Sequence, residues 1–120
     1  TYPPGLEIKA YRANCLTEQN GELDKNDPLR EHVALHIVSK PNRYRLLNIE
    51  APKEHHNPEL YLEVDTQSDF EVIQTIIEAL YPDNPNFSTV DIINFVNKNP
   101  SLIQKSQETE RRWKTFKEDV

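Results

Sequence analysis

The fold of this chain is decided by residues 63–70, which read EVDTQSDF. Apolar and polar residues alternate from Leu60 to Asp65, which is the period of a strand with one buried face. Thr66 followed by Asp69 is a capping-box pattern, in which each side chain satisfies a free backbone amide in the first turn of a helix. The stretch therefore predicts a strand that leads directly into a helix.

The C-terminal half reads as three helices. Apolar residues recur at helical spacing over 70–80, and a second capping-box pattern, Ser88 with Asp91, precedes another apolar stripe. Asn99-Pro100 is typical of a cap followed by a first-turn proline, which predicts the start of a third helix. The apolar positions expected along that third helix are Leu102, Ile103, Trp113 and Phe116.

The N-terminal half predicts two more strands, at 6–12 and 44–49, with a loop over 17–28 and a short helix over 29–39 between them. This order predicts the α/β class, with about three strands followed by C-terminal helices. Because a three-stranded sheet is small, we expect the whole chain (1–120) to be a single domain or a half-domain of something larger.

The composition excludes some classes of protein. The formal net charge of -6 argues against a general nucleic-acid binder, because nothing here would neutralise a run of phosphates. The single cysteine, Cys15, fits a reducing compartment. No apolar run approaches the roughly 18 residues that a membrane span requires. We therefore expect a cytoplasmic protein without nucleic-acid or membrane partners.

Two further features bear on how complete the sequence is. It contains no methionine, so we expect that Thr1 is not a natural beginning. Its only glycines are Gly5 and Gly21, so it lacks the glycine-rich loop that usually holds nucleotide phosphates. If the protein handles nucleotides, we expect that loop on a part of the protein outside this sequence.

A pair of carboxylates is the main candidate for chemistry. On a strand, Glu63 and Asp65 would share one face and lie roughly 6.5–7 Å apart along it. Asp65 would stand at the carboxyl end of the strand, where open α/β sheets bind their ligands. Magnesium suits such a place, because it binds through one or two carboxylates and substrate phosphates. The alternative is structural, since aspartates are common near helix starts, where they satisfy free amides.

Four motifs, in order, resemble a known family. They are the opening Tyr2-Pro3-Pro4-Gly5-Leu6, the helix start Arg30-Glu31-His32-Val33, the run Asp65-Thr66 with Asp69-Phe70 whose helix ends Glu78-Ala79-Leu80-Tyr81-Pro82, and the segment Phe87 to Pro100. Together they resemble the sugar nucleotidyltransferases that make CMP-linked acidic sugars, and within these the spore-coat polysaccharide biosynthesis group.

The resemblance implies the C-terminal part of a Rossmann-like nucleotidyltransferase domain, whose N-terminal nucleotide-binding half is absent here. It implies a cytidylyltransferase that uses Mg2+ to transfer CMP from CTP to an anionic sugar with release of pyrophosphate, and it is compatible with a homodimer. Asp65 would hold the metal and Glu63 would assist. Arg30 and His32 become candidates for contacting the anionic sugar or a partner subunit. Because the phosphate loop is missing, we expect this chain alone to be inactive.

Two rival interpretations stay open. The chain could be a non-catalytic module, derived from the same fold, that serves oligomerisation or sugar recognition. It could also come from a nucleotidyltransferase that uses another base, because base selection in this family lies in the absent half. Lys9 interrupts the acidic pattern that the family often has after the position of Gly5. That departure keeps an altered sugar specificity or a lost activity open.

Overall fold

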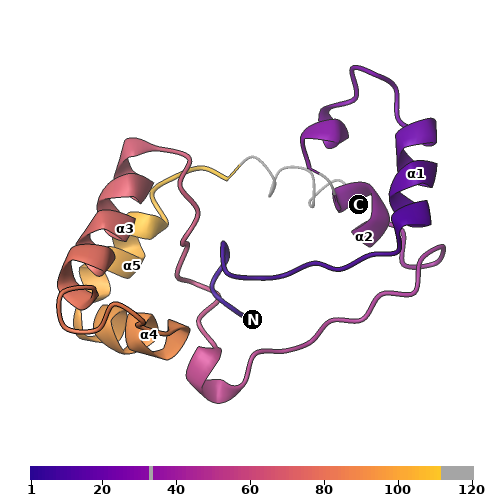
Figure 1. Cartoon of the computed structure of the whole chain (residues 1–120). Helices are drawn as coiled ribbons and strands as arrows, with labels where there is room; N and C mark the ends of the chain where they lie inside the picture. The colour runs from indigo at the N-terminus through magenta and orange to yellow at the C-terminus, as the bar shows by residue number, and fades with distance from the viewer. Residues whose placement is uncertain (33, 112–120) are drawn as a thin grey trace. The chain divides into compact units, whose positions relative to one another are not determined.

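The computed structural model describes residues 1–32 and 34–111, and these form helices joined by extended segments (Figure 1). The helices are α1 (Ala13–Glu22), α2 (Leu35–Val38), α3 (Gln67–Leu80), α4 (Thr89–Lys98) and α5 (Pro100–Ser106), with 3-10 turns η1 (Pro28–Glu31) and η2 (Lys53–His55). No helix in these two ranges is long and apolar enough to cross a membrane.

The chain folds as two compact units, which we describe separately. Unit 1 comprises Thr1–Glu7 and Ile49–Glu110, and it contains η2 and the three C-terminal helices. The described part of unit 2 comprises residues 8–32, 34–48 and 111, and it contains α1, η1 and α2.

Unit 1 has a small apolar core. Helices α3, α4 and α5 pack together (Figure 1), and Leu60, from the segment before α3, is fully buried with Val72, Ile76 and Val96. Burying an aliphatic side chain of this size stabilises a fold by roughly 1.5–3 kcal/mol. The partly buried residues that pack against this core are Leu62, Leu80, Ile92, Phe95, Leu102 and Ile103.

Both predicted capping boxes are confirmed. The Asp69 amide donates to Thr66 Oγ1 at 3.3 Å while Asp69 Oδ2 accepts from the Thr66 amide at 2.9 Å. The Ser88–Asp91 pair makes the same two bonds at the start of α4, at 3.3 and 2.7 Å. Hydrogen bonds from the amide and hydroxyl of Ser88 hold the pKa of Asp91 below its usual value.

The third C-terminal helix is confirmed at its beginning and is short. It starts at Pro100, one residue after Asn99, and ends at Ser106. Leu102 and Ile103 pack against the core as their spacing predicts. The predicted apolar positions Trp113 and Phe116 lie outside the described residues.

The predicted α/β class with about three strands is wrong, because the described residues contain no strand. Segments 6–12, 44–49 and 60–65 contain no helix and form no ladder. In the last of these, the Leu62 amide donates to the Pro4 carbonyl at 2.8 Å and the Tyr61 amide donates to Ser106 Oγ at 3.2 Å. A turn carbonyl and a hydroxyl thus satisfy amides that a neighbouring strand would otherwise bond.

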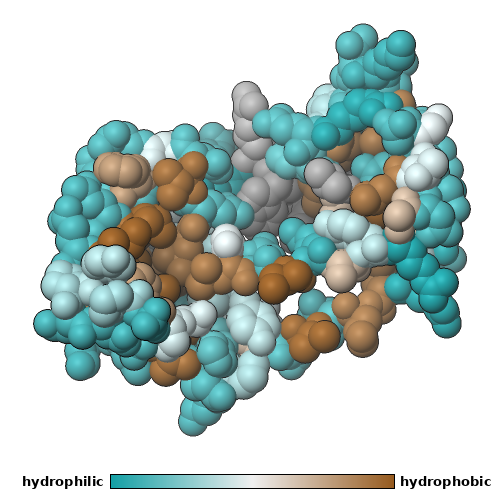
Figure 2. All heavy atoms as spheres, in the orientation of Figure 1, coloured by the Kyte–Doolittle hydropathy of each residue, from teal (hydrophilic) through white to brown (hydrophobic). Residues whose placement is uncertain are grey.

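In segments 6–12 and 44–49, apolar residues alternate with polar ones, but no second layer of described residues covers the apolar side chains. Ile8 is 93% exposed and Leu47 is 85% exposed. Apolar side chains are accordingly visible on the surface (Figure 2). Alternation specifies which face of a segment is apolar, but it does not provide a partner for the backbone.

Unit 2 departs from prediction in its first helix. Helix α1 (Ala13–Glu22) occupies part of the predicted loop 17–28, and the turn signal Asn20-Gly21 falls in its last turn. Its N-cap residue, Arg12, makes no side-chain capping bond, so the sequence gives no start signal. The short helix predicted over 29–39 is divided between η1 and α2.

A charged cluster joins α1 to the following elements of unit 2. The Glu22 carboxylate accepts from Arg43 Nη1 at 2.8 Å and lies 3.2 Å from His36 Nε2. These contacts, with Arg43 the larger contributor, lower the pKa of Glu22 to about 2. The cluster therefore keeps Glu22 ionised and links Glu22, His36 and Arg43 across unit 2.

The two glycines provide a matched test of the fold. Gly5 has φ +100°, and a Cβ added there would lie 2.6 Å from the backbone carbon and oxygen of Leu62. Gly5→Ala should therefore destabilise unit 1 by about 1–3 kcal/mol. Gly21 has nothing within 4 Å of an added Cβ, so Gly21→Ala should stabilise α1 by roughly 0.5–1 kcal/mol. Urea denaturation of both variants measures these changes, and an unchanged Gly5→Ala midpoint would contradict the close approach to Leu62.

Candidate functional site

The candidate site is organised by a buried carboxylate at the start of α3. Asp69 is 1% exposed. Its Oδ2 accepts from the Asp65 amide at 3.1 Å and from the amide and hydroxyl of Thr66, each at 2.9 Å. Its Oδ1 accepts from the Thr109 hydroxyl at 3.1 Å. A buried charge is tolerated only when it is hydrogen-bonded in this way, so Asp69 fixes the backbone around Thr66.

The same network reaches the chain that follows α5. The hydroxyls of Thr66 and Thr109 lie 2.9 Å apart, and Ser68 Oγ donates to Glu108 at 3.4 Å. Residues 108–109 are thereby attached to the first turn of α3.

The predicted metal residues lie immediately before this network. Asp65 is exposed and Glu63 is half-buried. The capping box of α3 is formed by Thr66 and Asp69, so the Asp65 carboxylate is not one of its two members. Because no strand forms, the spacing expected for a strand face does not apply to this pair.

The donor chemistry at this position fits magnesium. Carboxylate oxygens are hard ligands, and Mg2+ usually keeps several waters and binds through one or two carboxylates plus substrate phosphates. No group of three His, Cys, Asp or Glu residues in the described ranges could hold a metal ion. Asp69 does not add a third carboxylate, because both of its oxygens accept hydrogen bonds. Glu63 and Asp65 would thus need the oxygens of a bound phosphate.

Arg30, a predicted substrate-binding residue, hydrogen-bonds to backbone carbonyls at the C-terminal end of α1. Its guanidinium donates to the carbonyls of Asn20, Leu23 and Asp24 at 2.9, 2.7 and 2.7 Å. It also donates to the side-chain oxygen of Asn20 at 2.8 Å. The last carbonyls of a helix lack intrahelical partners, and a guanidinium here satisfies three chain carbonyls at once. Four of its five N–H groups are therefore engaged.

His32, the second predicted substrate-binding residue, is half-buried just after η1. Arg30 and His32 both belong to unit 2, whereas Glu63 and Asp65 belong to unit 1. The structure therefore places two of the predicted residues in each unit.

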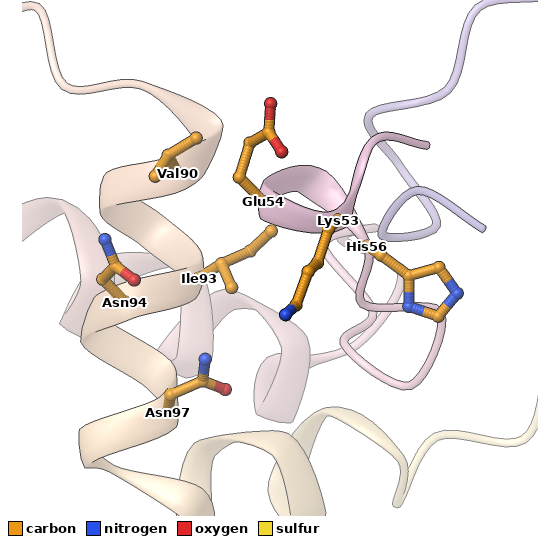
Figure 3. A pocket seen from close by; sticks show the side chains of 7 residues that line it. All are labelled: Lys53, Glu54, His56, Val90, Ile93, Asn94 and Asn97. Carbon is orange, nitrogen blue, oxygen red and sulfur yellow. The ribbon is translucent and has the colours of Figure 1, made fainter. Parts of the chain in front are cut away.

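A depression in unit 1 was missed by the sequence reasoning. It has a volume of about 320 Å³ and lies between η2 and α4 (Figure 3). Lys53, Glu54 and His56 line one side. Val90, Ile93, Asn94 and Asn97 of α4 line the other. The sequence signal for it is the pair Asn94 and Asn97, which are three residues apart and therefore lie on one face of α4.

Comparison with known proteins gives one informative relationship. The chain is similar to the spore coat polysaccharide biosynthesis protein SpsF of Bacillus subtilis (strain 168). The two sequences are 31% identical over 105 residues, which is 88% of this chain and 43% of that protein. The match confirms the resemblance to this group. The chain spans less than half of that relative's length. No protein-family model and no solved structure matches the chain.

The structural role of Arg30 can be separated from sugar binding. Lysine keeps the charge but is a single point donor, so Arg30→Lys cannot reproduce the bonds at the end of α1. We expect it to lower the free energy of unfolding by about 1–2 kcal/mol without any ligand. Arg45→Lys is the control, because Arg45 is exposed and makes no hydrogen bond to the described residues. Equal thermal midpoints for the two variants would show that Arg30 does not support α1.

Proposed function

We propose that this chain is part of a sugar cytidylyltransferase that serves polysaccharide biosynthesis. In the proposed reaction an oxygen of an anionic sugar attacks the α-phosphorus of CTP. A new phosphorus–oxygen bond forms, the bond to the β-phosphate oxygen breaks, and the products are a CMP-sugar and pyrophosphate. The similarity to SpsF, which is named for spore coat polysaccharide biosynthesis, supports the polysaccharide role. The four-motif resemblance supports the cytidylyl transfer.

The observation that carries the proposal is the arrangement at the start of α3. An exposed carboxylate, Asp65, directly precedes a first turn whose capping box is formed by Thr66 and Asp69. The Asp65 amide is bonded to the buried carboxylate of Asp69, so the backbone that bears Asp65 is held in place. A positioned, exposed carboxylate is what a magnesium–phosphate site requires of its protein.

The roles of the residues follow from this arrangement. Asp65 would hold Mg2+, and the half-buried Glu63 would assist. When bound, the ion would neutralise phosphate charge and orient the leaving pyrophosphate. Asp69 would act as a positioning residue through its bonds to Asp65 and Thr66. Arg30, with four of its N–H groups engaged, would offer the anionic sugar one remaining donor, and His32 would lie near it in sequence.

The other parts of the proposal concern the larger protein. Its substrates would be CTP and an anionic sugar. It would act in the cytoplasm as a homodimer. The chain contains no glycine-rich phosphate loop, so residues 1–120 alone should neither bind CTP tightly nor turn it over. A non-catalytic module for sugar recognition or oligomerisation is the rival function.

Asp65→Asn tests the proposed metal role in the longest natural protein that contains this sequence. The amide keeps the shape but loses the charge, so magnesium-dependent pyrophosphate release should fall by several orders of magnitude. The thermal midpoint should stay unchanged, because Thr66 and Asp69 make the capping bonds. The control is Asp83→Asn, since Asp83 is exposed and has no hydrogen-bond partner among the described residues. Near-normal release by the Asp65→Asn protein would remove the metal assignment and favour the non-catalytic module.

A further inference from the structure

We infer that the depression between η2 and α4 binds a neutral, hydroxyl-rich ligand the size of one monosaccharide. None of the residues that line it is Glu63, Asp65, Arg30 or His32. The inference is therefore independent of the proposed cytidylyl transfer, and it describes a second site in unit 1.

The wall formed by α4 combines apolar and amide groups on one stripe. Val90, Ile93, Asn94 and Asn97 follow the i, i+3, i+4, i+7 spacing that places side chains on a single helix face. Ile93 is 6% exposed and provides an apolar base, whereas Asn94 and Asn97 are exposed. Each carboxamide offers two donors and an acceptor. An apolar base flanked by amides suits a ring that has C–H groups on its face and hydroxyls on its edge.

The opposite wall provides an ammonium and a carboxylate. In Figure 3, Lys53 extends toward the end of the depression where Asn97 lies, and Glu54 extends toward the end where Val90 lies. The ring of His56 points away from α4 (Figure 3), so we assign it no contact. Lys53 can donate to a ring or hydroxyl oxygen, and Glu54 can accept from a hydroxyl.

These polar side chains have no partners within the described residues. No hydrogen bond or ion pair joins the side chain of Lys53, Glu54, Asn94 or Asn97 to any other described residue. Some polar side chains elsewhere in unit 1 are engaged locally. Asn99, for example, is on the turn that ends α4 and donates to the Phe95 carbonyl at 2.9 Å. The depression therefore concentrates hydrogen-bonding capacity that the fold does not use.

The charges favour an uncharged ligand. Lys53 and Glu54 cancel one another at the depression itself. Lys53, Lys98 and Lys105 are the only lysines in unit 1, which has no arginine, and its acidic residues far outnumber them. An anion would approach against that field, whereas a neutral polyhydroxylated ring would not.

The size limits the ligand to a single ring. A volume of about 320 Å³ is at the small end of ligand pockets, which typically span roughly 300–1,000 Å³. A nucleotide would extend beyond it. Because the depression is open to solvent, we expect millimolar affinity, which corresponds to about 4 kcal/mol.

A nuclear magnetic resonance titration of the 120-residue chain tests the inference. D-glucose and D-galactose are the neutral probes, and D-glucuronate and inorganic phosphate are the anionic ones. At least one neutral sugar should shift the side-chain amide signals of Asn94 and Asn97 saturably at millimolar concentration. The anions should bind more weakly than that sugar.

Variants connect the shifts to the depression. Asn97→Ala and Lys53→Gln should each weaken binding by about tenfold, which is the loss of roughly one hydrogen bond. Alanine has a higher helix propensity than asparagine, so α4 should persist in Asn97→Ala. A preserved backbone spectrum verifies this. Gln104→Ala on α5 removes an exposed helical amide elsewhere in unit 1 and should leave binding unchanged.

Three results would overturn the inference. They are the absence of saturable shifts with either neutral sugar, tighter binding of glucuronate or phosphate than of both neutral sugars, and an affinity that neither Asn97→Ala nor Lys53→Gln changes. The Asp65→Asn experiment is unaffected by any of them, because the two sites share no residue.

Discussion

The structure of unit 1 depends on one carboxyl group that is buried and hydrogen-bonded at both of its oxygens. Asp69 is almost entirely removed from solvent, and its two oxygens accept four hydrogen bonds from backbone amides and hydroxyls. A buried polar group left without partners costs about 1–3 kcal/mol, and a charged group costs more. The positive end of α3 favours the negative charge as well. The geometry around Thr66 is therefore set by the requirement that Asp69 be satisfied.

This requirement connects parts of unit 1 that are distant in sequence. Thr109 bonds to Asp69, which is 40 residues earlier, so the chain after α5 returns to the start of α3. The Tyr61 amide donates a hydrogen bond to Ser106 Oγ, and this bond holds the segment that carries Glu63 and Asp65 against the helices. The backbone of Asp65 is thereby held by a residue of the first turn of α3. Support of this kind from neighbouring residues is what a functional carboxylate needs in order to keep its position.

What could be predicted from sequence was decided by interactions within three or four residues. The Thr66–Asp69 capping box and the helical stripe after it are local, and both were recognised. The predicted sheet was wrong because a strand needs a partner strand that is distant in sequence. The Tyr61 amide donates to the Ser106 hydroxyl and not to a neighbouring strand. Arg30 was predicted from the family resemblance to contact an anionic sugar or a partner subunit. Its bonds to the carbonyls at the end of α1 could not be predicted, because the sequence carries no start signal for that helix. The four motifs predicted the resemblance to the SpsF group correctly. A comparison of motifs in their order along the chain does not depend on which secondary structure is predicted for them.

The central claim is that the buried Asp69 carboxylate positions the backbone of Asp65. Hydrogen exchange of the amides of Asp65 and Thr66, followed residue by residue, tests it directly, because Asp69 Oδ2 accepts from both. Both amides should exchange more slowly than in an unfolded peptide, and Asp69→Ala should remove that protection. Asp91→Ala, which deletes the equivalent box on α4, should leave it intact. Exchange of both amides at the unfolded rate in the unaltered chain would contradict the account.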